Sequence, residues 1–135
     1  MNSGRKGIRS QKNMDAEAIC AVAIDSLENY KAIDVVKLDV RQLTDIADFM
    51  LVVSGGSVRQ VKALAKHLDE DAKKAGCPSL GIEGLEYGDW VLVDLVDVIV
   101  HVMVPEAREL YRLEDLWNGS AYRSQPNEFD EFDEE

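Results

Sequence analysis

Hydrophobic side chains recur at helical spacing in two segments of the chain. In residues 15–31 the apolar positions fall on one helical face: Ile19, Val22, Ala23, Leu27 and Tyr30. Residues 57–75 carry a second stripe with strong end signals. Ser57 stands three residues before Gln60, which is the spacing of a capping box, and Gly76 occupies the position of a C-terminal glycine. The pattern predicts two amphipathic helices.

Segments of strand character lie between and after these helices, at residues 35–40, 49–53, 79–82, 90–95 and 98–104. Only Val96 and Asp97 separate the last two, which predicts a hairpin. A final helix is expected from Pro105, because proline fits the first helical position. The order α-β-β-α-β-β-β-α predicts an α/β fold with a mixed sheet of about five strands and helices mainly on one face. Residues 49–82 would form a right-handed parallel crossover.

The length of 135 residues corresponds to one domain. We place that domain at residues 14–120. The segment 1–13 is rich in Lys and Arg and is expected to be a disordered basic extension, and 121–135 is expected to be a disordered acidic tail. A transit peptide is the alternative for the basic start. No apolar run reaches the roughly 18 residues of a membrane span, so no membrane partner is expected.

Charge and cysteine content narrow the choice of partner and compartment. The formal net charge is −11, which disfavours DNA or a broad RNA-binding surface and favours a basic protein partner. Solubility alone would also account for this charge. The two cysteines, Cys20 and Cys77, indicate reduced thiols in a cytosolic compartment.

The sequence contains no clear enzyme signature. The loop 54–57, Ser-Gly-Gly-Ser, joins a strand to a helix, but it lacks the lysine of a P-loop. We expect its glycines to form the turn and Ser57 to cap the helix. Asp94 and Asp97 flank the hairpin turn, and Asp97 is expected to stabilise the turn through its side chain. No cysteine or histidine grouping has metal-site spacing, so neither a metal nor another cofactor is expected. The rival hypothesis is a nucleotide-binding or nucleotidyl-transferring enzyme that uses this loop and Asp94.

The two faces of the hairpin differ in character. One face is wholly aliphatic and is expected to lie under the helices. The other alternates with it and carries Trp90, Leu92, Asp94, Ile99, His101 and Met103. A large aromatic side chain with aliphatic neighbours and a few polar groups is typical of a surface that docks a partner. A second covered face, or a homodimer through this face, remains the alternative.

The chain resembles the ribosomal silencing factor family (RsfS, also called Iojap) over residues 15–117. The most specific stretch reads Gly-Asp-Trp-Val-Leu-Val-Asp-Leu at 88–95 and Asp-Val-Ile-Val-His-Val-Met at 97–103. Further matching segments lie at 48–49, 54–63, 81–84, 105–111 and 113–117. Two positions depart from the family pattern: Val96 replaces the usual glycine of the hairpin turn, and Gly56 replaces a threonine of the loop.

The resemblance implies a nucleotidyltransferase-like fold without catalysis. It also implies binding to the large ribosomal subunit through ribosomal protein L fourteen, which blocks joining of the small subunit and represses translation under nutrient limitation. Arg108, Tyr111 and Trp117 of the final helix would flank the docking face. The compartment would be the bacterial cytoplasm, with an organellar matrix as the less favoured alternative.

Overall fold

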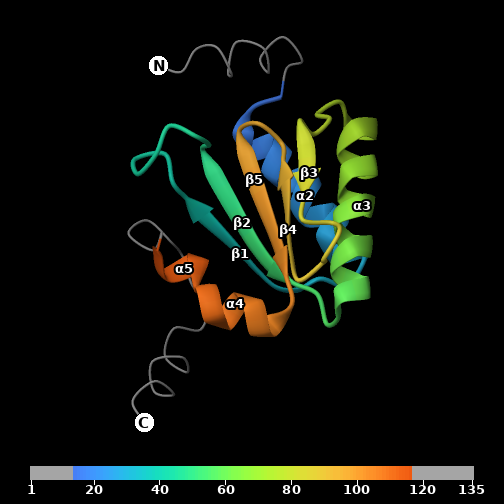
Figure 1. Ribbon diagram of the computed structural model, residues 1–135. Coiled ribbons are helices and arrows are strands. Elements are labelled where there is room, and N and C mark those ends of the chain that lie inside the picture. Colours follow the sequence, from blue (N-terminus) through green and yellow to red (C-terminus); the bar gives the residue numbers. More distant parts are fainter. Residues whose placement is uncertain (1–13, 117–135) are drawn as a thin grey trace.

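The computed structural model describes residues 14–116 as one five-stranded sheet with helices on both faces (Figure 1). The elements are α2 (Ala16–Asn29), β1 (Ile33–Asp39), β2 (Phe49–Ser54), α3 (Val58–Ala75), β3 (Gly81–Glu83), β4 (Trp90–Asp94), β5 (Val98–Met103), α4 (Pro105–Tyr111) and α5 (Leu113–Leu116). The strand order is β1-β2-β5-β4-β3. Strands β2 and β5 are parallel and the other neighbours are antiparallel, so the predicted mixed sheet is confirmed.

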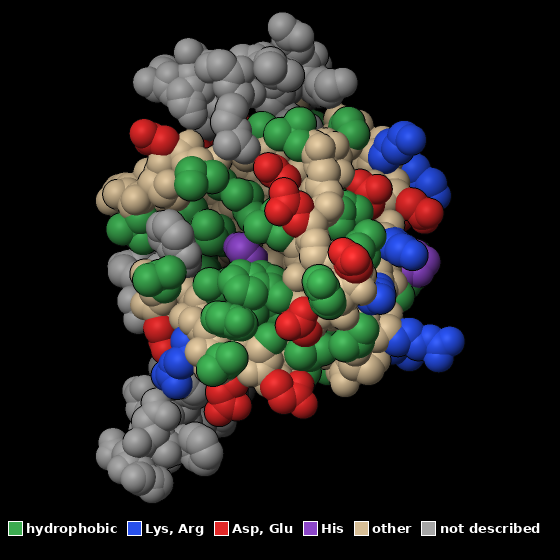
Figure 2. Space-filling view, in the orientation of Figure 1, with side chains coloured by type: hydrophobic (Ala, Val, Ile, Leu, Met, Phe, Trp, Pro, Cys, Tyr) green, Lys and Arg blue, Asp and Glu red, His purple; other side chains and the backbone are tan. Residues whose placement is uncertain are grey.

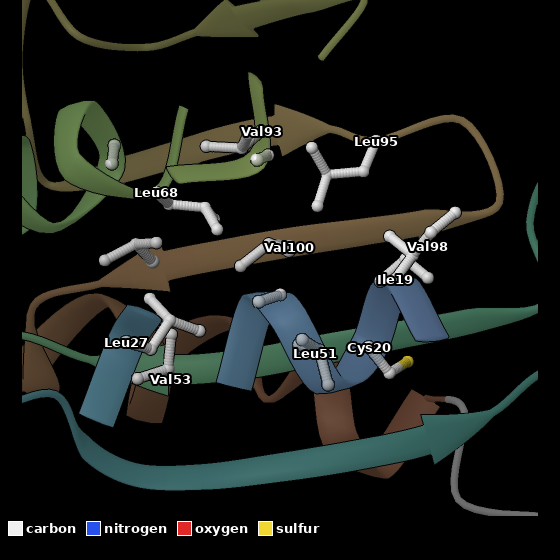
Figure 3. Packing of buried hydrophobic residues seen from close by; sticks show 14 of the residues in the cluster. Ile19, Cys20, Leu27, Leu51, Val53, Leu68, Val93, Leu95, Val98 and Val100 are labelled. Atoms are coloured by element: carbon white, nitrogen blue, oxygen red, sulfur yellow. The ribbon is translucent and has the colours of Figure 1, made fainter. Parts of the chain in front are cut away.

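Helices α2 and α3 cover one face of the sheet and enclose the larger core (Figures 1 and 3). Helix α3 has the predicted ends: Ser57 Oγ accepts the backbone N–H of Gln60 at 3.1 Å, and Gly76 adopts φ 95°. This core also takes one side of the hairpin, from Val91, Val93, Leu95, Val98, Val100 and Val102. The aliphatic face of the hairpin therefore lies under the helices, as predicted.

The connection from β2 through α3 reaches β3, at the far edge of the sheet. Strand β3 is antiparallel to β4, which is antiparallel to β5, so β3 runs in the same direction as β2. The predicted parallel crossover is therefore present, but it passes over two strands instead of joining neighbours.

The hairpin has the predicted register, in which Asp94 faces Ile99 and Leu92 faces His101. Its turn is strained, because Val96 adopts φ 76° and the N–H of Asp97 donates to the carbonyl of Leu95 at 3.0 Å. These are the features of a classic γ-turn, a conformation that β-branched residues rarely adopt. The carboxylate of Asp94 accepts the N–H of Val96 at 2.8 Å and so stabilises the turn.

Helices α4 and α5 lie on the opposite face of the sheet, in front of it in Figure 1. The sequence predicted one final helix from Pro105 onward. The structure divides it at Arg112, which adopts the left-handed φ of 47°. A smaller apolar cluster lies beneath these helices and comprises Val36, Leu38, Val40, Ala47, Met50, Val52, Ile99, Met103 and Ala107. Helices thus cover mainly one face, and a short pair covers part of the other.

Candidate docking site

Trp90 begins β4 and lies half-buried on the face of the sheet that carries α4. Its indole N–H donates a hydrogen bond to Nδ1 of His101 at 3.1 Å. Its ring packs against that of Tyr111, with centroids 4.7 Å apart and planes inclined by 43°. The indole is therefore fixed by two neighbours while part of it stays accessible, as an interface anchor requires.

His101 lies on β5 directly opposite Leu92 and is only 6% exposed. Burial lowers its pKa to about 4, so the imidazole is neutral at pH 7. Because Nδ1 accepts the indole hydrogen, the imidazole proton resides on Nε2. Nε2 has no hydrogen-bond partner among residues 14–116. The sequence placed His101 on the contact surface, whereas the structure makes it a buried support that orients Trp90.

Ile99 and Met103 also lie beneath the surface, with exposures of 7% and 0%. Strand alternation correctly put them on the same face as Trp90, but the expectation that they line an accessible surface is wrong. Both belong to the cluster that includes Ala107 of α4, a helix that folds back over this end of the sheet. They form the floor of the site.

Leu92 and Asp94 are the members of β4 that remain half-exposed beside Trp90. Tyr111 at the end of α4 is 51% exposed and extends the same aromatic area. We use the name docking face for the accessible parts of Trp90, Leu92, Asp94 and Tyr111, which form the candidate site for a partner. Trp117, which the sequence placed on its flank, lies outside the described residues.

Acidic side chains surround the docking face. Glu83 is exposed and pairs directly with Leu92, so it projects from the same face of the sheet. Other exposed carboxylates stand on the adjoining loop and helix: Glu86, Asp89, Glu106 and Glu109. Figure 2 shows hydrophobic side chains gathered on this side of the molecule with acidic ones among and around them. An apolar centre with a negative rim is complementary to a basic surface that offers an apolar pocket.

Arg108 does not flank this surface as predicted, because its side chain points inward and is 9% exposed. Its Nε donates to Glu114 at 3.0 Å, and Nη1 donates to the carbonyl of Asp34 at 2.8 Å and to Ser54 Oγ at 2.9 Å. Nη2 lies 2.9 Å from the Glu114 carboxylate, so the guanidinium is paired although that contact is poorly aligned as a hydrogen bond. Arg108 fixes α4 and α5 to β1 and β2. Sequence reasoning missed Glu114, which had no local signal.

The Ser-Gly-Gly-Ser loop is engaged within the chain. A Cβ at Gly55 would lie 2.9 Å from the side chain of Val61, so glycine permits the close approach of strand and helix. The N–H of Gly56 donates to the side chain of Gln60 at 2.8 Å. Ser57 caps α3, as described above. The structural role predicted for these residues is confirmed.

Among residues 14–116, no group of three or more His, Cys, Asp or Glu side chains is arranged to hold a metal ion. Over the same range, no helix has the length and apolar character required to cross a membrane.

The comparisons with known proteins identify the family. The family model described as "Ribosomal silencing factor during starvation" matches residues 13–135. The chain belongs to the ribosomal silencing factor family. It is 46% identical over 106 residues to the ribosomal silencing factor RsfS of Chromobacterium violaceum, covering 78% of this chain and 87% of that one. The RsfS of Bacillus subtilis is 36% identical over 104 residues, with coverage of 77% and 88%.

Solved structures agree with this assignment. The crystal structure of a Chromobacterium violaceum protein matches with a TM-score of 0.77 at 42% identity, and covers 84% of this chain and 98% of that one. A Bacillus halodurans structure matches with a TM-score of 0.68 at 37% identity, and covers 75% and 94%. The mixed α/β fold is therefore shared with proteins of related sequence. The family resemblance predicted from the hairpin and loop motifs is confirmed.

Proposed function

We propose that this ribosomal silencing factor binds the large ribosomal subunit by placing its docking face on ribosomal protein L fourteen. A protein bound there would prevent the small subunit from joining and so would reduce translation under nutrient limitation. The protein would act by occupying a surface, without catalysis, in the bacterial cytoplasm.

The observation that carries this proposal is the pair formed by Trp90 and Tyr111. Two aromatic rings in contact, one of them held by a buried histidine, form a rigid and partly accessible centre. Aromatic anchors of this kind supply much of the binding energy of protein interfaces. The negative rim adds complementarity to a basic ribosomal protein and speeds association.

The test is co-sedimentation of Tyr111→Ala with purified large subunits, beside Tyr30→Ala as a matched control. Tyr30 is 38% exposed and also stacks on a histidine, with ring centroids 3.8 Å apart, but it lies at the end of α2 beside α3. Truncation of an anchor costs about 2 kcal/mol, so Tyr111→Ala should bind about thirtyfold more weakly. Tyr30→Ala should bind within about threefold of the wild type.

Trp90→Ala should show at least the same loss of affinity, provided the variant is folded at the assay temperature. Light scattering then measures the rate at which small subunits join large subunits carrying each variant. Wild type and Tyr30→Ala should block joining, and Tyr111→Ala should not at equal concentration. Equal binding by all variants would contradict the docking face, and binding without a block would contradict the mechanism.

A further inference from the structure

Among the described residues, the cations without a carboxylate partner are concentrated on one helix. Within residues 14–116, four basic side chains have a carboxylate partner: Lys37, Arg41, Arg108 and Arg112. The remaining six have no carboxylate of residues 14–116 within 4 Å: Lys31, Arg59, Lys62, Lys66, Lys73 and Lys74. Five of these six lie on α3. In Figure 2, most of the visible Lys and Arg side chains lie along the side of the molecule where Figure 1 shows α3.

The carboxylates of α3 do not neutralise these cations. Asp69 accepts the hydroxyl of Ser79 at 2.6 Å, and Asp71 accepts the hydroxyl of Ser26 at 2.7 Å. Both acids therefore serve packing of the helix against its neighbours. Glu70 is the one exposed carboxylate between residues 59 and 74.

The exposed cations share the outward face of the helix. Arg59, Lys66 and Lys73 follow one another at intervals of seven residues, or two helical turns, so they form a row about 21 Å long. The buried side chains of α3, which include Val61, Leu64 and Leu68, lie on the opposite side. Lys62 borders the row, and its ammonium donates to the carbonyl of Glu86 at 3.3 Å. We call Arg59, Lys62, Lys66, Lys73 and Lys74 the α3 row.

The α3 row itself presents charge without a large apolar side chain. Between Arg59 and Lys74 the one exposed apolar side chain of α3 is Ala63, and the larger exposed apolar neighbours, Val58 and Tyr30, lie at the start of α3 and against His67. Contacts with a phosphate backbone need only positive charge at suitable intervals. The row packs on the opposite face of the sheet from the docking face, and Lys62 connects it to the loop 84–89 that leads into Trp90 at the β3 edge.

We propose that the α3 row contacts the phosphate backbone of ribosomal RNA beside the protein on which the docking face rests. This inference depends on the proposed function, since it assigns a second contact to the same bound state. The net charge of −11 repels free RNA. The row therefore acts once docking has brought it next to phosphates, as the second site of a bivalent contact.

The test compares two double variants that change net charge equally. Arg59→Gln/Lys66→Gln removes two exposed cations of the row. Lys37→Gln/Arg41→Gln, the control, removes two cations whose side chains are 36% and 54% exposed and which pair with Glu17 and Asp39 at the other edge of the sheet. Dissociation constants for purified large subunits are measured between 50 and 300 mM potassium chloride by fluorescence anisotropy. Two lost phosphate contacts should weaken binding about tenfold at 100 mM and lower the slope of log Kd against log salt by roughly 1.5.

The control should bind within about twofold of the wild type with an unchanged salt slope. The same proteins are then titrated with isolated ribosomal protein L fourteen, for which Arg59→Gln/Lys66→Gln should match the wild type. An equal loss on the isolated protein would assign the α3 row to a protein contact and overturn the RNA assignment. If both double variants lose the same affinity for large subunits, the loss follows from net charge alone, and the RNA assignment is overturned.

The acidic segment 126–135 is the other candidate to bind the α3 row in place of RNA. The weaker binding of Arg59→Gln/Lys66→Gln to large subunits should persist when the chain ends at Gln125. Its disappearance there would show that the segment, not RNA, occupies the row. If the wild type itself fails to bind large subunits, the proposed function fails. If the wild type binds and Arg59→Gln/Lys66→Gln binds identically, the RNA contact alone fails.

Discussion

The hydrogen bond from Trp90 to His101 can be removed with little change in shape. Trp90→Phe keeps an aromatic ring beside Tyr111 but eliminates the indole N–H that lies 3.1 Å from Nδ1. The Nδ1 acceptor then loses its donor inside a site where His101 is 6% exposed and where Nε2 already lacks a partner among the described residues. Leaving a buried acceptor unpaired costs about 1–3 kcal/mol, so the free energy of unfolding should fall by about 2 kcal/mol.

The same site predicts how the stability of the wild type depends on pH. The pKa of His101 is about 4 in the folded protein because of burial, against about 6.5 when unfolded. Between these values the unfolded chain binds more protons, so the free energy of unfolding decreases as pH falls from 6.5 to 4. The full difference amounts to about 3 kcal/mol. His101→Leu should remove this contribution.

Urea denaturation followed by circular dichroism at pH 7.5 and pH 5 measures both effects. The loss in free energy of unfolding for Trp90→Phe/His101→Leu should be smaller than the sum of the losses for the two single variants, because replacing both partners removes the unpaired acceptor. Nitrogen NMR of the wild type should show the proton on Nε2. If Trp90→Phe is as stable as the wild type, or His101→Leu keeps the full loss of stability at pH 5, the structural account of this pair is refuted.

Three further predictions concern other parts of the molecule. Glu114→Gln weakens the partner of the buried Arg108 guanidinium and should lower the free energy of unfolding by about 3 kcal/mol, measured by urea denaturation. A chain that ends at Gln125 should bind large subunits within threefold of the full chain; a loss beyond tenfold in co-sedimentation would place the acidic segment in the interface. Calorimetric titration with ATP or CTP and magnesium should give no micromolar binding, since Ser57, Gly56 and Gln60 satisfy one another; clear heat would favour the enzyme hypothesis.

The hairpin was predictable from sequence because its determinants are local. Two apolar strands of period two, separated by two residues, fix which side chains face each other. The pairs of Trp90 with Met103 and Leu92 with His101 follow directly. The caps of α3 were predictable for the same reason, since Ser57, Gln60 and Gly76 act within one or two turns of the helix.

The burial of the site residues was not predictable in this way. Whether Ile99, His101 and Met103 are accessible depends on α4, which returns over the sheet after β5 ends. The position of α4 depends in turn on Arg108, whose partners include Asp34 and Ser54, 74 and 54 residues away. Such contacts leave no periodic signal. The sequence around an arginine in an amphipathic helix is therefore the same whether its side chain points outward to a partner or inward to the sheet.

The long-range contacts of Arg108 also explain how the docking face is assembled. Trp90 comes from β4 and Tyr111 from α4, so their contact at 4.7 Å exists only while α4 holds its position. The guanidinium fixes α4 through Ser54 of β2 and Glu114 of α5. Aromatic anchors that are held before binding lose less conformational entropy when a partner arrives, which favours affinity. Loosening α4 at Glu114 should therefore weaken large-subunit binding through Tyr111, although Glu114 is buried and offers the partner no surface.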